Sequence, residues 1–358
     1  MIRSLLSADY PRSRLVAAIL LVIVVALALA PFLFPGARSL AVAAKILVFV
    51  LLVASYDLLL GYTGIVSFAH TMFFGIGAYG VAIASTRMGP GWDAVALGLA
   101  CALPLSALLA LVIGLFSLRV KAIFFAMITL AVAAAFQTLA SQLSEFTGGE
   151  DGLTFKVPEL LQPSFELFED TVLGVSIDGR LLSYYLLFFV VLALFLVLLR
   201  IVNSPFGRVL QAIRENDFRA EALGYRTVVF RTLSTVLAAV FATMAGALLA
   251  IWLRYNGPDT TLSFEIMLDT LLIVVIGGMG TMYGAVIGSA LFVFAQSYLQ
   301  DLMGWISAGF EGVPLVAALF SPDRWLLWLG VLFVLSVYYF PTGVVGKLRA
   351  RALARRRP

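Results

Sequence analysis

Apolar segments about as long as a membrane is thick alternate with short polar segments along the whole chain. A helix of about 20 mostly apolar residues crosses the hydrocarbon core of a bilayer and satisfies its own backbone hydrogen bonds there. The pattern therefore predicts an all-α transmembrane fold of about ten membrane-spanning helices. The predicted spans are residues 15–34, 39–60, 65–86, 94–118, 122–142, 181–200, 232–252, 264–280, 283–303 and 324–341.

The composition agrees with a membrane protein and leaves no room for a second, soluble domain. Hydrophobic residues make up 62% of the 358 positions and charged residues 12%, whereas a soluble domain has roughly 45–50% and about 25%. Residues 1–358 are therefore expected to form a single transmembrane domain. Cys101 is the only cysteine, so it forms no internal disulfide and is interpreted as a packing residue.

The first predicted span has some features of a secretory signal. Arg12 and Arg14 precede an apolar stretch whose end, residues 28–30, resembles a cleavage site. Pro31 follows this site directly and further spans come later, so we predict an uncleaved first helix.

Lys and Arg residues are concentrated in alternate loops, and this distribution provides an independent check on the number of spans. Cytoplasmic loops of membrane proteins are enriched in Lys and Arg, and an even number of spans places both termini on that side. The outer loop 143–180 would carry eight acidic residues against two basic ones, and 17 of the 24 Lys and Arg residues would lie inside. We therefore predict cytoplasmic N- and C-termini. The inner residues are Arg3, Arg12, Arg14, Arg119, Lys121, six arginines from Arg200 to Arg231, and six basic residues in the tail 347–358, which would contact anionic lipid.

Two glycine-rich segments interrupt the apolar pattern. In GYTGIVSFAH (61–70), Gly61 and Gly64 each cost about 1 kcal/mol in a helix interior, and the nearby hydroxyls compete for backbone hydrogen bonds. A second interruption, GGMGT (277–281), occupies a corresponding part of the other half of the chain. Paired broken or re-entrant segments are typical of a transport path between structural repeats. The candidate path residues are Tyr62, Thr63, Ser67, His70, Gly278 and Thr281.

Other interpretations of these segments stay open. The small residues from Gly75 to Gly80 favour close helix packing. His70, the only histidine, would serve as an interhelical hydrogen-bonding group, a path-lining group or a pH-sensitive gate, and it is not enough for a His-rich metal site.

Few charged residues fall inside the predicted spans. Lys45, Asp57, Glu265 and Asp269 are interpreted as snorkelling or locally paired, with Arg254 approaching the last two. An ion-driven carrier would need a deeply placed ionisable residue, and Asp57 is the best candidate for that role.

The inner loop 201–231 is predicted to contain a helix and a half. Ser204 suits the N-cap, Pro205 the first helical position, and Gly224 a left-handed end. One face of the first helix is apolar, and its partner is either the protein's own helix ends or a separate cytoplasmic subunit. The apolar face consists of Phe206, Val209, Leu210 and Ile213.

Several of these segments resemble the LivM/LivH permeases of ATP-binding-cassette importers for branched-chain amino acids. They are GYTGIVSFAHTMFFGIGAYG (61–80), AIRENDFRAEALGYRTVVFRTLS (212–234) with AGALLA (245–250), and GGMGTMYGAVIG (277–288). TGGEDGL (147–153) resembles the LivM branch. Ile65 and Ala285 depart from the glutamine and proline that family members often have. Ile65 lies close to the predicted path, so urea or short amides stay open as solutes.

The resemblance implies a single transmembrane permease domain in the bacterial inner (plasma) membrane. It would pair with a homologous second permease subunit, two cytoplasmic ATP-binding subunits and an external solute-binding protein. ATP would be used by the partner subunits, with no cofactor on this chain and no nucleic acid as partner. The resemblance also implies that residues 206–224 couple to the ATPase; the residues concerned are Phe206, Arg214, Glu215, Asp217, Glu221 and Gly224.

The motifs argue against an enzyme. The chain lacks the spacing of an ATP-binding P-loop, since GVVGKL (343–348) does not match it, and we find no cluster of residues suited to catalysis or metal binding. The remaining alternative to an importer subunit is a secondary carrier or channel that acts alone.

Overall fold

The computed structural model describes residues 13–33, 36–116, 122–166, 176–309, 319–340 and 342–354. The predicted inner residues Arg3, Arg12, Arg119 and Lys121, the last arginines of the tail and part of the outer loop lie outside these ranges.

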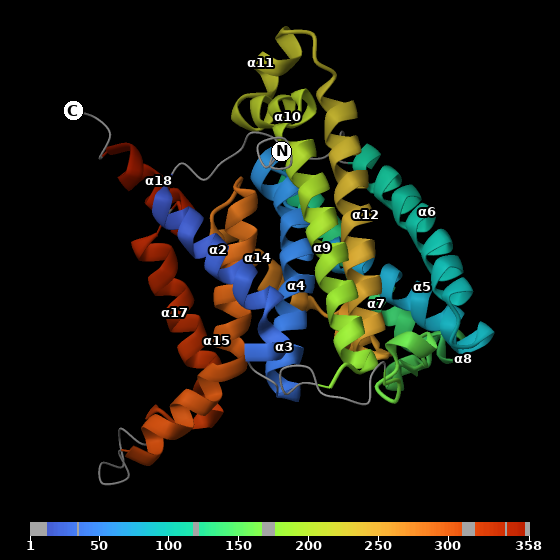
Figure 1. Cartoon of the computed structure of the whole chain (residues 1–358). Coiled ribbons are helices and arrows are strands. Elements are labelled where there is room, and N and C mark those ends of the chain that lie inside the picture. Colours follow the sequence, from blue (N-terminus) through green and yellow to red (C-terminus); the bar gives the residue numbers. More distant parts are fainter. Residues whose placement is uncertain are drawn as a thin grey trace.

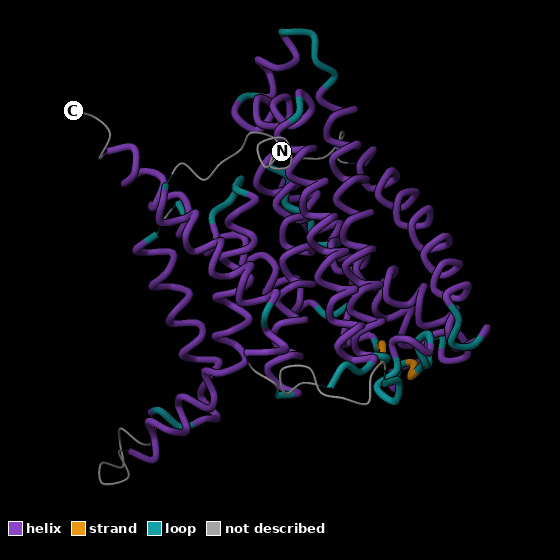
Figure 2. Tube along the Cα trace, in the orientation of Figure 1, coloured by secondary structure: helices purple, strands orange, loops and turns teal. Residues whose placement is uncertain are grey.

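The described chain is almost entirely helical, and Figures 1 and 2 show the helices side by side in one bundle. One two-stranded antiparallel ribbon pairs Leu153 with Asn256. The longer helices are α2 (Arg14–Ala28), α4 (Ala37–Asp57), α5 (His70–Met88), α6 (Trp92–Phe116), α7 (Ala122–Gln142), α9 (Gly179–Asn203), α10 (Pro205–Glu215), α12 (Thr227–Leu253), α14 (Phe264–Gly277), α15 (Met282–Gly309), α17 (Trp325–Tyr339) and α18 (Gly343–Ala354). The short elements are α3 (Ala30–Leu33), η1 (Leu58–Thr63), α8 (Ser144–Thr147), η2 (Gly149–Asp151), β1 (Leu153–Thr154), η3 (Glu159–Leu161), α11 (Asp217–Ala222), β2 (Tyr255–Asn256), α13 (Pro258–Thr261) and η4 (Pro322–Arg324).

Each predicted span overlaps a helix, although the span predicted from residue 65 becomes helical only at His70, and the class of all-α membrane protein is confirmed. Among the described residues, seven helices are long and apolar enough to cross a membrane by length and composition. The other three predicted spans fall on α2 and α17, of 15 residues each, and on α5, which has 19 residues but carries His70, three glycines and Arg87.

Most of α4 and α12 is buried, whereas α6 and α7 expose most of their surface. Helix α5 packs closely against α12 and α6 through glycines. A Cβ atom on Gly77 would collide with the Thr243 carbonyl, and one on Gly246 with the Phe74 carbonyl. Gly80 likewise lies against the Gly98 backbone, so the packing interpretation of Gly75–Gly80 is confirmed.

The two ends of the bundle differ. Helices α10 and α11 project from one end, called here the α10 end, and the β ribbon lies at the other, called the ribbon end (Figures 1 and 2). Helices α17 and α18 lie along one edge beside α15, and α6 forms the opposite edge (Figure 1). The ribbon joins the loop after α8 to the connection between α12 and α14.

Candidate functional site

The first glycine-rich segment breaks its helix as predicted. Helix α4 continues into the π-helical turn η1, and Gly64 has a left-handed backbone with φ of 75°. The Ile65 N–H then donates to the Leu59 carbonyl over 3.0 Å, and residues 64–69 are non-helical until α5 begins at His70. Glycine is suited to position 64 because a side chain there would strain the backbone. A π-helical turn is uncommon and often marks a functional site.

The second glycine-rich segment breaks in the same way. Helix α14 ends at Gly277, and α15 begins at Met282. Between them Gly278 and Gly280 have φ of 115° and 76°. The Thr281 hydroxyl donates to the Gly278 carbonyl over 2.6 Å and closes the turn.

The two breaks touch each other. The backbone N–H of Gly280 donates to Oδ1 of Asp57, at the end of α4, over 2.9 Å. A Cβ atom on Gly280 would lie 2.8 Å from the Gly61 carbonyl oxygen, and one on Gly61 would collide with the Gly280 nitrogen. Neither glycine can take a side chain without moving the other segment, so the two breaks form one packed unit.

Helix α10 closes this unit from the bundle's end. Nη1 of Arg214 donates a hydrogen bond to the Gly61 carbonyl. The same nitrogen would lie 2.9 Å from a Cβ atom on Gly280. We call the four residues that meet here the junction: Asp57, Gly61, Arg214 and Gly280. Asp57 is 1% exposed, and the charge of Arg214 helps to compensate its carboxylate.

His70 is a buried hydrogen-bonding residue in this structure. Its Nε2 lies 2.8 Å from the Ser55 hydroxyl, and that hydroxyl donates its hydrogen to the Leu52 carbonyl over 2.7 Å. Nε2 therefore carries the proton and donates to Ser55. The imidazole also lies 5.1 Å from the Tyr56 ring, so His70 ties the start of α5 to α4. This is the interhelical role among the three that the sequence left open.

The six candidate path residues gather around the breaks. Thr63 donates to the Leu58 carbonyl over 2.9 Å and also contacts Ser234 of α12. Thr281 is half-buried. The remaining candidates, Tyr62, Thr63, Ser67, His70 and Gly278, are buried within this chain. Their role in a solute path stays a prediction.

The apolar face of α10 packs on the protein's own helix ends. Leu210 and Ile213 are 0% and 1% exposed, and Phe206 stacks on Phe230 of α12 at 5.7 Å. The caps are as predicted: the Ser204 side chain accepts from the Gly207 N–H, and Gly224 has φ of 89°. Of the two partners that the sequence left open, the bundle itself therefore covers this face.

Helix α11 and the residues on either side of it present a different surface. Phe218 and Leu223 are 84% and 72% exposed, and Glu215 and Gly224 are also exposed. Two contacts join this part of the loop to α12. The Asp217 carboxylate pairs with Arg231 at 3.0 Å, and the Thr227 hydroxyl donates to Oε1 of Glu221 over 2.7 Å.

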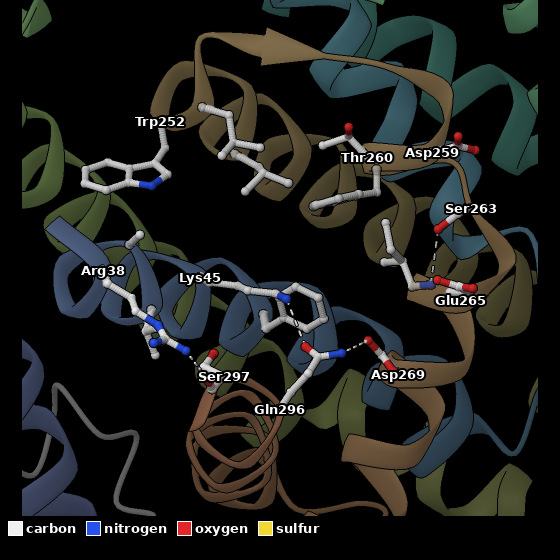
Figure 3. A pocket seen from close by; sticks show the side chains of 17 residues that line it. Arg38, Lys45, Trp252, Asp259, Thr260, Ser263, Glu265, Asp269, Gln296 and Ser297 are labelled. Carbon is white, nitrogen blue, oxygen red and sulfur yellow. Dashed lines mark hydrogen bonds between the residues drawn. The ribbon is translucent and has the colours of Figure 1, made fainter. Parts of the chain in front are cut away.

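A cavity of about 640 Å³ lies toward the ribbon end, between α4, α12, α14 and α15 (Figure 3). None of the six candidate path residues lines it. Its lining includes Lys45, Glu265 and Asp269, which the sequence had indicated as snorkelling or locally paired. Sequence reasoning missed Gln296, although a glutamine within a span is itself a signal.

The expected approach of Arg254 to Glu265 and Asp269 is wrong. Arg254 interacts instead with Asp178 and Arg180, near the start of α9. Burial and the charge of Arg180 lower the pKa of Arg254, and Asp178 opposes this. The α12–α14 connection, which includes β2, directs Arg254 toward α9.

An all-α, multi-pass membrane bundle with two facing helix breaks has the architecture of a membrane permease. Residues 38–337 match the family described as branched-chain amino acid transport system / permease component. The chain therefore belongs to that family and is a multi-pass protein of the bacterial inner membrane.

Individual relatives support the same family. The chain is 26% identical over 301 residues to the high-affinity branched-chain amino acid transport system permease protein LivM of Salmonella typhimurium, covering 80% of this chain and 69% of the relative. LivM of Escherichia coli is 26% identical over 79% of this chain and 68% of its own length. BraD of Pseudomonas aeruginosa, a permease protein of the same kind, is 26% identical, and the match covers 84% of this chain and 92% of BraD. No solved structure matches the chain.

Proposed function

We propose that this chain is a permease subunit of an ATP-binding-cassette importer and forms part of the path for branched-chain or related amino acids. Family membership and the names of the relatives support this assignment. The observation that carries the mechanism is the junction, where Arg214 of the loop helix binds the first break and the first break touches the second.

The proposed orientation places the α10 end in the cytoplasm and the ribbon end outside. The loop 201–231 with its five arginines lies at the α10 end, and the acidic residues described between 143 and 166 lie at the ribbon end. With ten spans, both termini are cytoplasmic, consistent with α18 lying toward the α10 end in Figure 1.

In this proposal α11 receives the force from a partner ATPase. The exposed Phe218 of α11 and Leu223 directly after it suit a docking surface, while Asp217 and Glu221 connect α11 to the start of α12. Through Arg214, α10 passes the movement to both breaks. A docked ATPase shifts the conformational equilibrium only if it contacts the two states differently, and a loop joined to both α12 and the junction provides that difference.

The proposed assembly contains a homologous second permease subunit, making a heterodimer, with two ATP-binding subunits and an external solute-binding protein. This chain is a transport subunit rather than an enzyme, and the partners bind and hydrolyse the ATP. The exposed apolar faces of α6, α7 and α17 suit contact with lipid or with the second permease.

The test is uptake of labelled leucine into proteoliposomes. The complete complex should accumulate leucine only with ATP, and this chain alone should not. A stand-alone secondary carrier would instead show flux with this chain alone, driven by an ion gradient. Unlabelled urea and acetamide serve as competitors: if they displace leucine as well as valine does, the branched-chain assignment is wrong.

A further inference from the structure

We propose that the cavity between α4, α12, α14 and α15 binds an α-amino acid zwitterion with an apolar side chain. Lys45 would hold the ligand's carboxylate, Asp269 its ammonium group, and the apolar wall its side chain. The inference rests on the proposed transport function and assigns its solute to a place away from the helix breaks.

The size and position of the cavity suit a small solute. Its volume of about 640 Å³ falls within the range of about 300–1,000 Å³ that is usual for small-molecule sites. It lies in the half of the bundle that the proposed orientation makes external, where a solute-binding protein would release its cargo. Arg38, at the start of α4, pairs with Asp301 at 2.7 Å and donates to the Ser297 carbonyl.

One wall carries a positive and a negative charge held apart by an amide. Nζ of Lys45 donates to Oε1 of Gln296 over 2.9 Å, and Nε2 of Gln296 donates to Oδ2 of Asp269 over 3.1 Å. Figure 3 shows Gln296 between the other two side chains. An ammonium group has three donors and a carboxylate about four acceptor sites, so both can bind further groups. Charges inside a span are costly and usually functional.

This arrangement matches a zwitterion better than a singly charged solute. The ligand's carboxylate can accept a charge-assisted hydrogen bond from Lys45, and its ammonium group can donate one to Asp269. Because a zwitterion is neutral overall, the site gains no net charge when it binds. A solute with only one charge can pair with Lys45 or with Asp269, and the other of these two residues then gains no charged partner. The glutamine keeps the two groups from neutralising each other directly.

Besides Asp259, Thr260, Ser263 and Glu265, the cavity lining has an apolar part. It includes Phe49, Phe74, Leu249, Trp252 and Ile266, from α4, α5, α12 and α14. An aliphatic side chain removed from water against these residues is favoured in proportion to the area it buries. The polar wall would therefore recognise the amino-acid group, and the apolar wall would favour branched aliphatic side chains.

The cavity is connected to the junction by the same helices. From Lys45 to Asp57 along α4 is twelve residues, about 18 Å at 1.5 Å per residue. Helix α14 runs from Asp269 to the second break, and α15 from that break to Gln296. A ligand that draws Lys45 and Asp269 together acts on one end of these helices, and Arg214 acts on the other. The solute and the nucleotide cycle would thus affect one set of helices.

The test measures displacement of tritiated leucine from the purified complex, assembled without the solute-binding protein. In the unaltered complex, leucine should compete about tenfold better than leucinamide, which lacks the carboxylate, or 4-methylpentanoate, which lacks the ammonium, because each loses a charge-assisted contact. If leucine, leucinamide and 4-methylpentanoate displaced tritiated leucine equally well from the unaltered complex, that result alone would overturn the proposal.

Two substitutions then assign the contacts. Asp269→Asn should weaken leucine binding about tenfold and abolish the preference for leucine over 4-methylpentanoate. Lys45→Met should likewise weaken leucine binding about tenfold, and it should abolish the preference for leucine over leucinamide. Asp93→Asn is the matched control, because it makes the same Asp-to-Asn change at an exposed position at the start of α6 that does not line the cavity, and it should change leucine binding less than about twofold.

The outcomes separate this inference from the proposed function. ATP-driven leucine uptake by the complete, unaltered complex tests the function alone. If that uptake is present but Asp269→Asn and Lys45→Met bind all three compounds as the unaltered complex does, the triad of Lys45, Gln296 and Asp269 is only a structural cross-link and the inference is wrong.

Discussion

The Arg214 guanidinium donates a hydrogen bond to the Gly61 carbonyl, so a loop helix and a helix break are joined by one side chain. The family resemblance implies that Arg214 belongs to the segment 206–224 that couples to the ATPase. Its hydrogen bond to Gly61 makes it a link between the docking loop and the breaks, and several consequences can be measured.

Replacing Arg214 should uncouple transport. Arg214→Gln shortens the side chain and removes the charge, so α10 loses its hold on the Gly61 carbonyl. Losing a charge-assisted hydrogen bond changes an equilibrium constant by a factor of about ten or more. We therefore expect the amount of leucine accumulated per ATP hydrolysed to fall by about that factor, while ATPase activity persists. Arg208→Gln, an exposed arginine on the same helix, is the control. Full accumulation in both variants would contradict the role of Arg214.

The contact between the breaks should make glycine necessary at position 61. In Gly61→Ala the methyl group would collide with Oδ1 of Asp57 and with the Gly280 nitrogen. Overpacking of this kind typically costs about 1–3 kcal/mol, so the variant should unfold at a lower temperature in detergent. The control is Gly330→Ala in α17, where a Cβ atom meets nothing within 4 Å. Equal melting temperatures in the two variants would show that the breaks do not pack as described.

Asp57 distinguishes the importer from a stand-alone carrier. Asp57→Asn keeps an oxygen that can accept from the Gly280 N–H, so ATP-driven uptake should stay within about twofold of the unaltered complex. Asp57→Leu removes the acceptor, leaves the N–H of the half-buried Gly280 without its partner and should cost about 1–3 kcal/mol of stability. A stand-alone carrier that uses Asp57 for its driving ion would lose flux completely in Asp57→Asn.

The exposed surface of α11 should matter for assembly more than for folding. Phe218 is 84% exposed, so Phe218→Ser should change the free energy of unfolding by no more than about 0.5 kcal/mol. It should nevertheless reduce the amount of ATPase that co-purifies with the chain. Leu210 of α10 is fully buried, and Leu210→Ala should cost about 2–5 kcal/mol. Unchanged recovery of ATPase with Phe218→Ser would place the docking surface elsewhere.

Features that depend on neighbouring residues could be predicted from the sequence. Long apolar segments predicted the helices, because the bilayer sets both their length and their composition. Gly61, Gly64 and Gly278 predicted the breaks, since glycine weakens a helix wherever the helix packs. Ser204, Pro205 and Gly224 predicted the start and end of the loop helices, because caps act within a few residues.

Contacts between distant segments were decided only by the tertiary structure. Asp57 and Gly280 are 223 positions apart, and Lys45 and Gln296 are 251 apart. No periodicity in a single sequence relates such positions. The sequence left two partners open for the apolar face of α10, and the packing of Phe206 on Phe230 identified the bundle. Composition and local backbone preference act on a segment by itself, whereas the junction and the charged cavity exist only where separate helices meet, which depends on how all the side chains pack together.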